Sequence, residues 1–107
     1  MWEEKLALYD KIVRMCPRFE RKGKTVPYTS ANGHMFSILN KDGEVGIRFS
    51  EGTKKKYLEK YKTTAFKSHG ATMRGYTLIT DKMLADLKLV VTLLDESYDY
   101  VMSLDHK

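Results

Sequence analysis

The sequence predicts an α+β domain in which three helices pack against an antiparallel sheet. Two tight turns separate strand-like segments in the first half of the chain, and apolar residues recur with a helical period near both ends. A shorter helical segment lies between these parts. The chain has 107 residues, of which 42% are hydrophobic and 31% are charged. This size suits one hydrophobic core, so we expect a single domain over residues 1–107.

The first element is a helix over Glu3–Cys16. Leu6, Tyr9 and Val13 recur at the three-and-four spacing of one helical face. Pro17 ends this helix, because a proline pushes the residue before it out of the helical region. The acidic start of the chain lacks the basic segment followed by an apolar run that is typical of a signal peptide.

The next part of the chain predicts a three-stranded meander. Asn32-Gly33 is a strong signal for a two-residue hairpin, since both central positions of a type I′ turn need a positive φ. Asn40–Gly43 is a second tight turn. Pro27 lacks a backbone donor, which places the first strand at an edge or gives it a bulge. The three strands are expected over residues 24–31, 34–39 and 44–49.

A middle helix is expected over Glu51–Lys62, with Ser50 as its N-cap. Tyr57, Leu58 and Tyr61 form one stripe at helical spacing, and the lysines of this segment fall opposite. Base stacking needs aromatic side chains exposed among basic ones. Because the two kinds are separated here, the lysines are interpreted as a solvated helix face.

The second half predicts two strands and a long helical segment. The strands are expected over Thr64–Lys67 and Gly75–Thr80, and the helical segment over Asp81–Leu104. Asp86 can cap a new helix, so a break at this position is expected. The core is expected to include the side chains of Phe36, Phe49 and Leu94.

Taken together, these segments resemble the TfoX N-terminal domain family. The shared pattern includes a Gly and a Met-Phe in the second strand, a strand ending at a helix cap, a Met-x-x-Tyr strand, and a last helix ending in Tyr-Val. The match covers about residues 12–104. Its features fall on Gly33, Met35, Phe36, Phe49, Ser50, Tyr61, Phe66, Met73, Tyr76, Tyr100 and Val101. One departure is the segment Thr25–Tyr28, where members often carry a Met-Phe-Gly type of sequence.

The resemblance implies a regulatory role rather than an activity. The namesake of the family regulates natural competence, and its full-length form has a second, helical domain that is not expected in these 107 residues. The family supplies no accepted catalytic residues to carry over. A shared fold is also a weak guide to function.

A search for reactive side chains finds no catalytic, metal or cofactor motif. Cys16 is the only cysteine, which excludes an internal disulfide and favours a reducing cytoplasm. It lies on an apolar helix face and is interpreted as a packed thiol. His34 and His69 are interpreted as an exposed strand residue and a loop residue, and His34, His69 and His106 share no metal-ligand spacing.

The acidic side chains of the last helix were the remaining candidates for acid–base chemistry. Asp95, Glu96 and Asp99 are interpreted as a solvated face, since paired catalytic carboxylates need a cleft. We therefore expect no catalytic residues, no metal, no cofactor and no small-molecule substrate. The protein is not expected to be an enzyme, although an enzyme of unknown type remains a third reading.

The clustering of charged residues is the one surface feature of the sequence that points to binding. The net charge is +5, and no apolar run reaches the length of about 20 residues that spans a bilayer. We expect a cytoplasmic binding or regulatory module acting through protein contacts, with a partner protein or as a homodimer. The alternative is a weak nucleic-acid-binding accessory protein with no membrane contact. Its basic surface would comprise Arg18, Arg21, Lys22, Lys24, Lys55, Lys56 and Lys62, provided that these residues lie side by side.

Overall fold

The computed structural model describes residues 1–106 and confirms the α+β class. Within these residues, no helix is long and apolar enough to cross a membrane. The elements follow one another as α1 (Trp2–Arg14), β1 (Tyr28–Ala31), β2 (His34–Leu39), β3 (Val45–Arg48), α2 (Glu51–Lys60), β4 (Ala65–Ser68), β5 (Ala71–Ile79), α3 (Asp81–Leu84) and α4 (Leu87–Met102).

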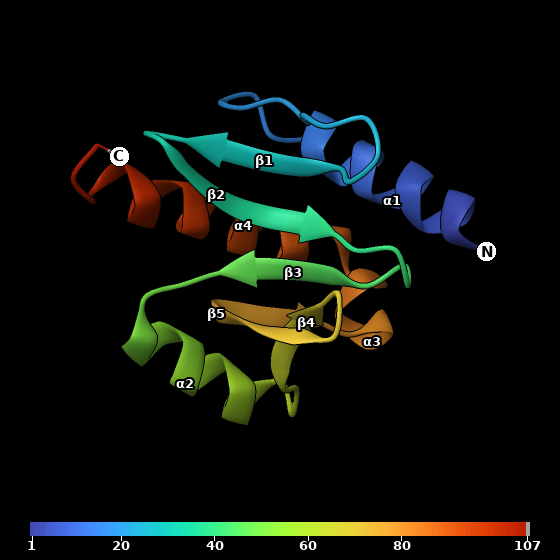
Figure 1. Cartoon of the computed structure of the whole chain (residues 1–107). Coiled ribbons are helices and arrows are strands. Elements are labelled where there is room, and N and C mark those ends of the chain that lie inside the picture. The colour runs from blue at the N-terminus through green and yellow to red at the C-terminus, as the bar shows by residue number, and fades with distance from the viewer. Residues whose placement is uncertain (107) are drawn as a thin grey trace.

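The five strands form one antiparallel sheet with the order β1-β2-β3-β5-β4. The expected meander of the first three strands is confirmed. Helices α1 and α4 lie behind the strands in Figure 1 and pack against each other and against β2. Helix α2 lies beside β5. We call the side of the sheet under α1 and α4 the covered face, and the other side the open face.

The main core lies between the covered face and the helices. Phe36, Phe49 and Leu94 are at most 2% exposed, which confirms their expected burial. Burying a large apolar side chain stabilises a fold by about 1.5 to 3 kcal/mol. Tyr57 on α2 and Tyr61, which caps the end of α2, pack against the edge of this core, so the tyrosine stripe faces inward as expected.

Helix boundaries follow the capping signals in the sequence. The Ser50 hydroxyl accepts a hydrogen bond from the backbone of Thr53 at 3.4 Å, and α2 begins one residue after Ser50. The Asp86 carboxylate accepts from the backbone of Leu89 at 3.2 Å. The expected break at Asp86 is confirmed, since it separates the short α3 from α4.

Two strands begin four residues away from the expected position, and the ends of β3 and β4 differ by one residue. The first strand was expected from Lys24 but begins at Tyr28, because Lys22 and Tyr28 exchange backbone hydrogen bonds and the residues between them form a turn. The last strand was expected from Gly75 but begins at Ala71. His69 and Gly70 have φ values of 53° and 76°, which make the tight turn that joins β4 to β5.

A bulge in β2 decides which side chains reach the core. Thr29 lies opposite Ser37, but the next residue of β1 lies opposite Met35, so Phe36 is an extra residue. Phe36 and Ser37 are therefore both buried on the covered face, while Met35 packs on the open face. The Tyr76 hydroxyl donates to the Met35 carbonyl at 2.8 Å, which anchors the bulged segment. The expectation from Pro27 is confirmed in its first form, because β1 is an edge strand of the sheet, and the bulge lies in its partner β2.

Candidate functional site

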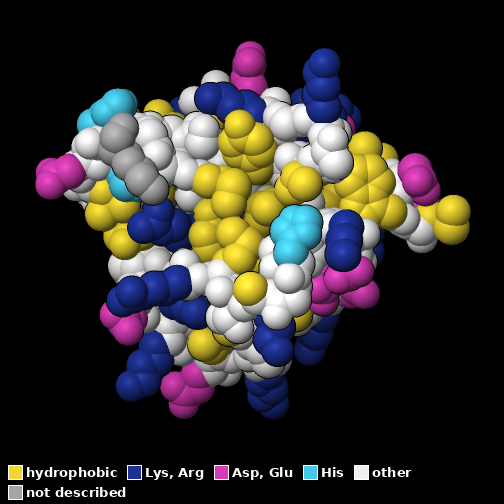
Figure 2. Space-filling model, in the orientation of Figure 1, with side chains coloured by type: hydrophobic (Ala, Val, Ile, Leu, Met, Phe, Trp, Pro, Cys, Tyr) yellow, Lys and Arg dark blue, Asp and Glu magenta, His cyan; other side chains and the backbone are white. Residues whose placement is uncertain are grey.

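The open face of the sheet carries a second apolar cluster that no helix covers within residues 1–106. Tyr28 of β1 lies opposite Ile38 of β2, and Leu78 of β5 continues this row on the other side of Gly46 in β3. Figure 2 shows apolar side chains gathered at the centre of this face, with Lys and Arg on several sides of them. The cluster consists of the buried Ile38, Phe66 and Tyr76 and the partly buried Val26, Tyr28, Met35, Met73 and Leu78.

The β4–β5 hairpin folds over one end of this face and leaves the rest open. The fully buried ring of Phe66 lies on Gly46 of β3, where an added Cβ would be 2.6 Å from the ring. The Asn40 side chain donates to the carbonyl of Lys67 at 2.9 Å, which fastens β4 to the β2–β3 turn. Sequence reasoning missed this surface, because a regular β2 places Met35 on the same side as Ser37.

The first part of the predicted basic surface is neutralised by acids of the same chain. Arg18 donates to Asp99 at 2.8 Å and to Asp95 at 3.2 Å, and its guanidinium lies 4.4 Å from the centre of the Tyr98 ring. Hydrogen bonding to Asp99 raises the pKa of Arg18 above its ordinary value. Asp95 and Asp99 keep solvent exposure of 37% and 66%, so they lie on a solvated face as expected and also pair with Arg18 there.

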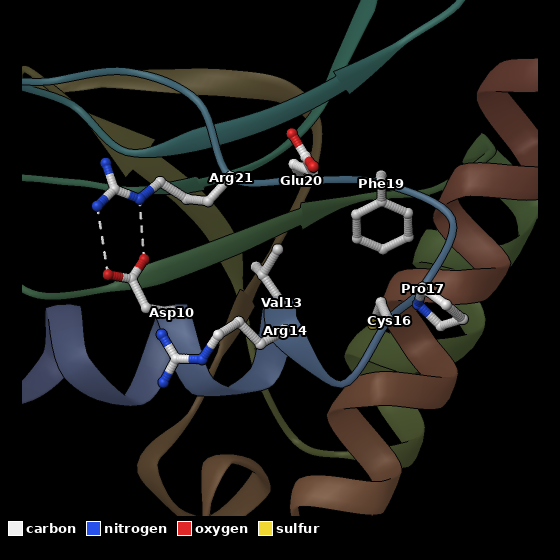
Figure 3. Close-up of a pocket in the computed structure, with 8 residues that line it drawn as sticks. All are labelled: Asp10, Val13, Arg14, Cys16, Pro17, Phe19, Glu20 and Arg21. Atoms are coloured by element: carbon white, nitrogen blue, oxygen red, sulfur yellow. Dashed lines mark hydrogen bonds and ion pairs between the residues drawn. The ribbon is translucent and has the colours of Figure 1, made fainter.

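Arg21 is paired in the same way. Its guanidinium donates to both carboxylate oxygens of Asp10, at 2.9 and 3.2 Å, and the two side chains face each other in Figure 3. A cavity of about 450 Å³ lies beside this pair, with Cys16 and Phe19 at its other end. The bidentate geometry is the strongest form of an arginine–carboxylate contact, so Arg21 is engaged within the chain.

The other five residues of the predicted surface lie at two separate edges of the sheet. Lys22 and Lys24 lie by the outer edge of β1, where Lys22 bridges to Tyr28. Lys55, Lys56 and Lys62 are exposed on or just after α2, which packs beside β5. The strands β2 and β3 separate the two groups (Figure 1). The seven residues therefore do not form one continuous surface.

Because of this division, nucleic acid binding is expected to be weak. Replacing Lys55, Lys56 and Lys62 with Gln should leave the free energy of unfolding within about 0.5 kcal/mol per site. The Kd for DNA or RNA should be at or above about 10⁻⁶ M at physiological salt in both proteins. Fluorescence anisotropy over a salt series measures this. Sub-micromolar binding by the wild type, with a shallower salt slope in the triple variant, would contradict the expectation.

Cys16, His34 and His69 have structural roles, and His34 is partly buried rather than exposed. The Cys16 side chain is 2% exposed and donates to the carbonyl of Ile12 at 3.6 Å. Burial raises the pKa of its thiol to about 11, which disfavours the reactive thiolate. His34 bonds the carbonyl of Asp105 at 2.8 Å, and the exposed His69 sits in the β4–β5 turn.

The remaining acid of the last helix also has a structural partner. The Tyr57 hydroxyl donates to Glu96 at 2.6 Å, which ties α2 to α4. Burial, aided by this carboxylate, raises the pKa of Tyr57 to about 12. No group of three or more metal-ligating side chains gathers anywhere in residues 1–106.

Comparisons with protein-family models, with curated proteins and with solved structures find no match for this chain. The resemblance to the TfoX N-terminal domain family therefore stays a prediction from the sequence. The open face of the sheet is the candidate site that the geometry itself presents.

Proposed function

We propose that this protein is a non-catalytic binding module that docks a partner protein on the open face of its sheet. The observation that carries the proposal is the apolar cluster on this face, over which no helix lies within residues 1–106. Tyr28, Met35 and Met73 lie at its surface, and tyrosine and methionine are enriched in protein interfaces. Methionine side chains also adapt to the shape of a partner.

The charge around the open face favours an acidic partner. Lys22 bridges to Tyr28, Arg48 lies opposite Tyr76, and Arg74 follows Met73 in β5, so basic residues border the cluster. A second copy of this chain would bring a like-charged border against this one, and each chain carries a net charge of +5. Complementary charge across an interface increases the rate and specificity of association. We therefore favour an acidic protein over self-association.

A regulatory role in the cytoplasm is the finer part of the proposal. It is supported by the motifs shared with the TfoX N-terminal domain family and by the lone thiol at Cys16. The resemblance supports a regulatory role in general.

Matched acidic substitutions on the two sides of the molecule test the proposal. Met35→Asp places a charge on the open face, and Thr92→Asp places the same charge on the exposed side of α4. The immobilised wild type should capture an acidic protein from an extract of the host. Met35→Asp should weaken the captured protein's affinity at least about tenfold, or about 1.4 kcal/mol, and Thr92→Asp should not.

Binding can be measured by calorimetry with the captured protein once it has been purified. Circular dichroism on both variants checks that each is folded. Equal affinity for the wild type, Met35→Asp and Thr92→Asp would contradict docking on the open face. Capture of a basic protein would contradict the assigned charge of the partner.

A further inference from the structure

A cavity of about 560 Å³ lies at the end of the sheet, where β3 ends and α2 begins. Its volume falls within the range of small-molecule sites. Four elements, β3, α2, β5 and α4, contribute to its walls. The charged and polar lining residues are Arg48, Glu51, Lys54, Arg74 and Tyr100.

Three cations converge on this cavity without an acidic partner. Each of Arg18 and Arg21 forms an ion pair, but none of the ion pairs within residues 1–106 includes Arg48, Lys54 or Arg74. Glu51 is the one acid in the lining, and it is exposed in the first turn of α2. The cavity therefore has an excess of positive charge that a bound anion would offset.

Contacts with α4 hold one of these cations, Arg48, in place. The Ser97 hydroxyl donates to the carbonyl of Arg48, and the Arg48 guanidinium lies 5.7 Å from the centre of the Tyr100 ring. Gly75 has a φ of +87°, and its missing side chain leaves one wall of the cavity free beside Arg48. The N-terminus of α2 adds a partial positive charge beside Lys54.

We infer that this cavity binds a small molecule that carries a phosphate group. Arg48 and Arg74 supply planar forks of N–H donors that match phosphate oxygens, and Lys54 adds a mobile positive charge. The Tyr100 ring forms an apolar wall for the organic part of the ligand. A cavity with one cluster of cations suits one phosphate group, whereas a nucleic acid strand needs a track of cations along its backbone.

Titration with inorganic phosphate and with AMP tests this inference. Both ligands should raise the melting temperature of the wild type in proportion to the logarithm of their concentration above Kd. Arg74→Gln and Lys54→Gln should each weaken binding at least about tenfold in calorimetry. Lys55→Gln is the matched control, because Lys55 is an exposed neighbour on α2 that lies outside this cavity. The affinity of the Lys55→Gln variant for phosphate should equal that of the wild type.

Three results would overturn the inference. The first is that neither inorganic phosphate nor AMP binds the wild type with a Kd below about 10 mM. The second is an equal loss of phosphate affinity in Arg74→Gln, Lys54→Gln and Lys55→Gln. This result would mean that binding depends on the net charge of the protein and not on this cavity. The third is tighter binding of a single-stranded oligonucleotide than of AMP, with a slope of log K against log salt that corresponds to several phosphate contacts. Arg48 and Arg74 also border the open face, so Lys54→Gln separates the two sites. This variant should weaken phosphate binding and leave the affinity for the partner protein unchanged.

Discussion

Replacing Phe36 with Ala is expected to lower the free energy of unfolding by about 3 to 5 kcal/mol, because it removes a large side chain from a closely packed site. Phe36 is completely buried, and its ring meets Phe19 at 5.0 Å and Tyr98 at 6.0 Å between centroids. Such aromatic pairs contribute beyond the area that they bury. Urea denaturation followed by circular dichroism measures the change.

Phe36→Leu is the matched control. It keeps most of the apolar volume and should lose much less stability than the Ala variant. A loss below about 1 kcal/mol for Phe36→Ala would mean that Phe36 faces away from the core. The bulge would then be absent and Met35 would not belong to the open face, since a shift of one residue reverses the faces of a strand.

Replacing Asn40 with Ala is expected to lower the free energy of unfolding by about 2 to 4 kcal/mol, because each buried polar group left unpaired costs about 1 to 3 kcal/mol. Asn40 is 2% exposed, and its side-chain oxygen accepts from the backbone of Asp42 at 3.1 Å and of Glu44 at 2.8 Å. Its nitrogen donates to the Lys67 carbonyl at 2.9 Å. Thermal and urea denaturation measure the loss.

Asn40→Asp separates the two roles of this side chain. The carboxylate keeps the bonds to the turn but loses the donor to Lys67 and lies beside Glu44. Amide hydrogen exchange should then speed up in β4, which Asn40 fastens, and remain slow in β2. If the amide hydrogens of β4 exchanged at the same rate in the wild type and in Asn40→Asp, Asn40 would not hold the hairpin over the open face.

Signals that act within a few residues predicted much of the fold. Asn32 and Gly33 both have a positive φ, at 55° and 78°, as a type I′ turn requires. Ser50 and Asp86 begin helices where their side chains offer a cap. These features depend on neighbouring residues alone, so a single sequence is sufficient to find them.

The bulge and the β4–β5 hairpin could not be predicted from the same signals. Phe36 is an extra residue only in relation to β1, and nothing in the local sequence marks it. The hairpin turn places His69 at a φ of 53°, a conformation that histidine adopts far less readily than glycine. Turn signals based on Asn-Gly therefore missed it.

The candidate sites were hidden for a related reason. Arg18 is 77 and 81 residues from the aspartates that pair with it, and sequence alone does not show such contacts. The sequence therefore presents Arg18 as a free cation. Arg48 and Arg74 looked like ordinary strand residues, because only the pairing of β3 with β5 and the start of α2 bring them to one cavity.

Photo-crosslinking in the living host tests most directly the claim that the open face of the sheet is a docking surface. p-Benzoylphenylalanine in place of Tyr28 lies on the open face, and the same group in place of Lys88 lies on the exposed side of α4. We expect a defined adduct with one acidic protein from position 28 and none from position 88. The same adducts from both positions, or adducts from position 88 alone, would contradict the claim, and a product of twice the protein's own mass would identify a second copy of the chain as the partner instead.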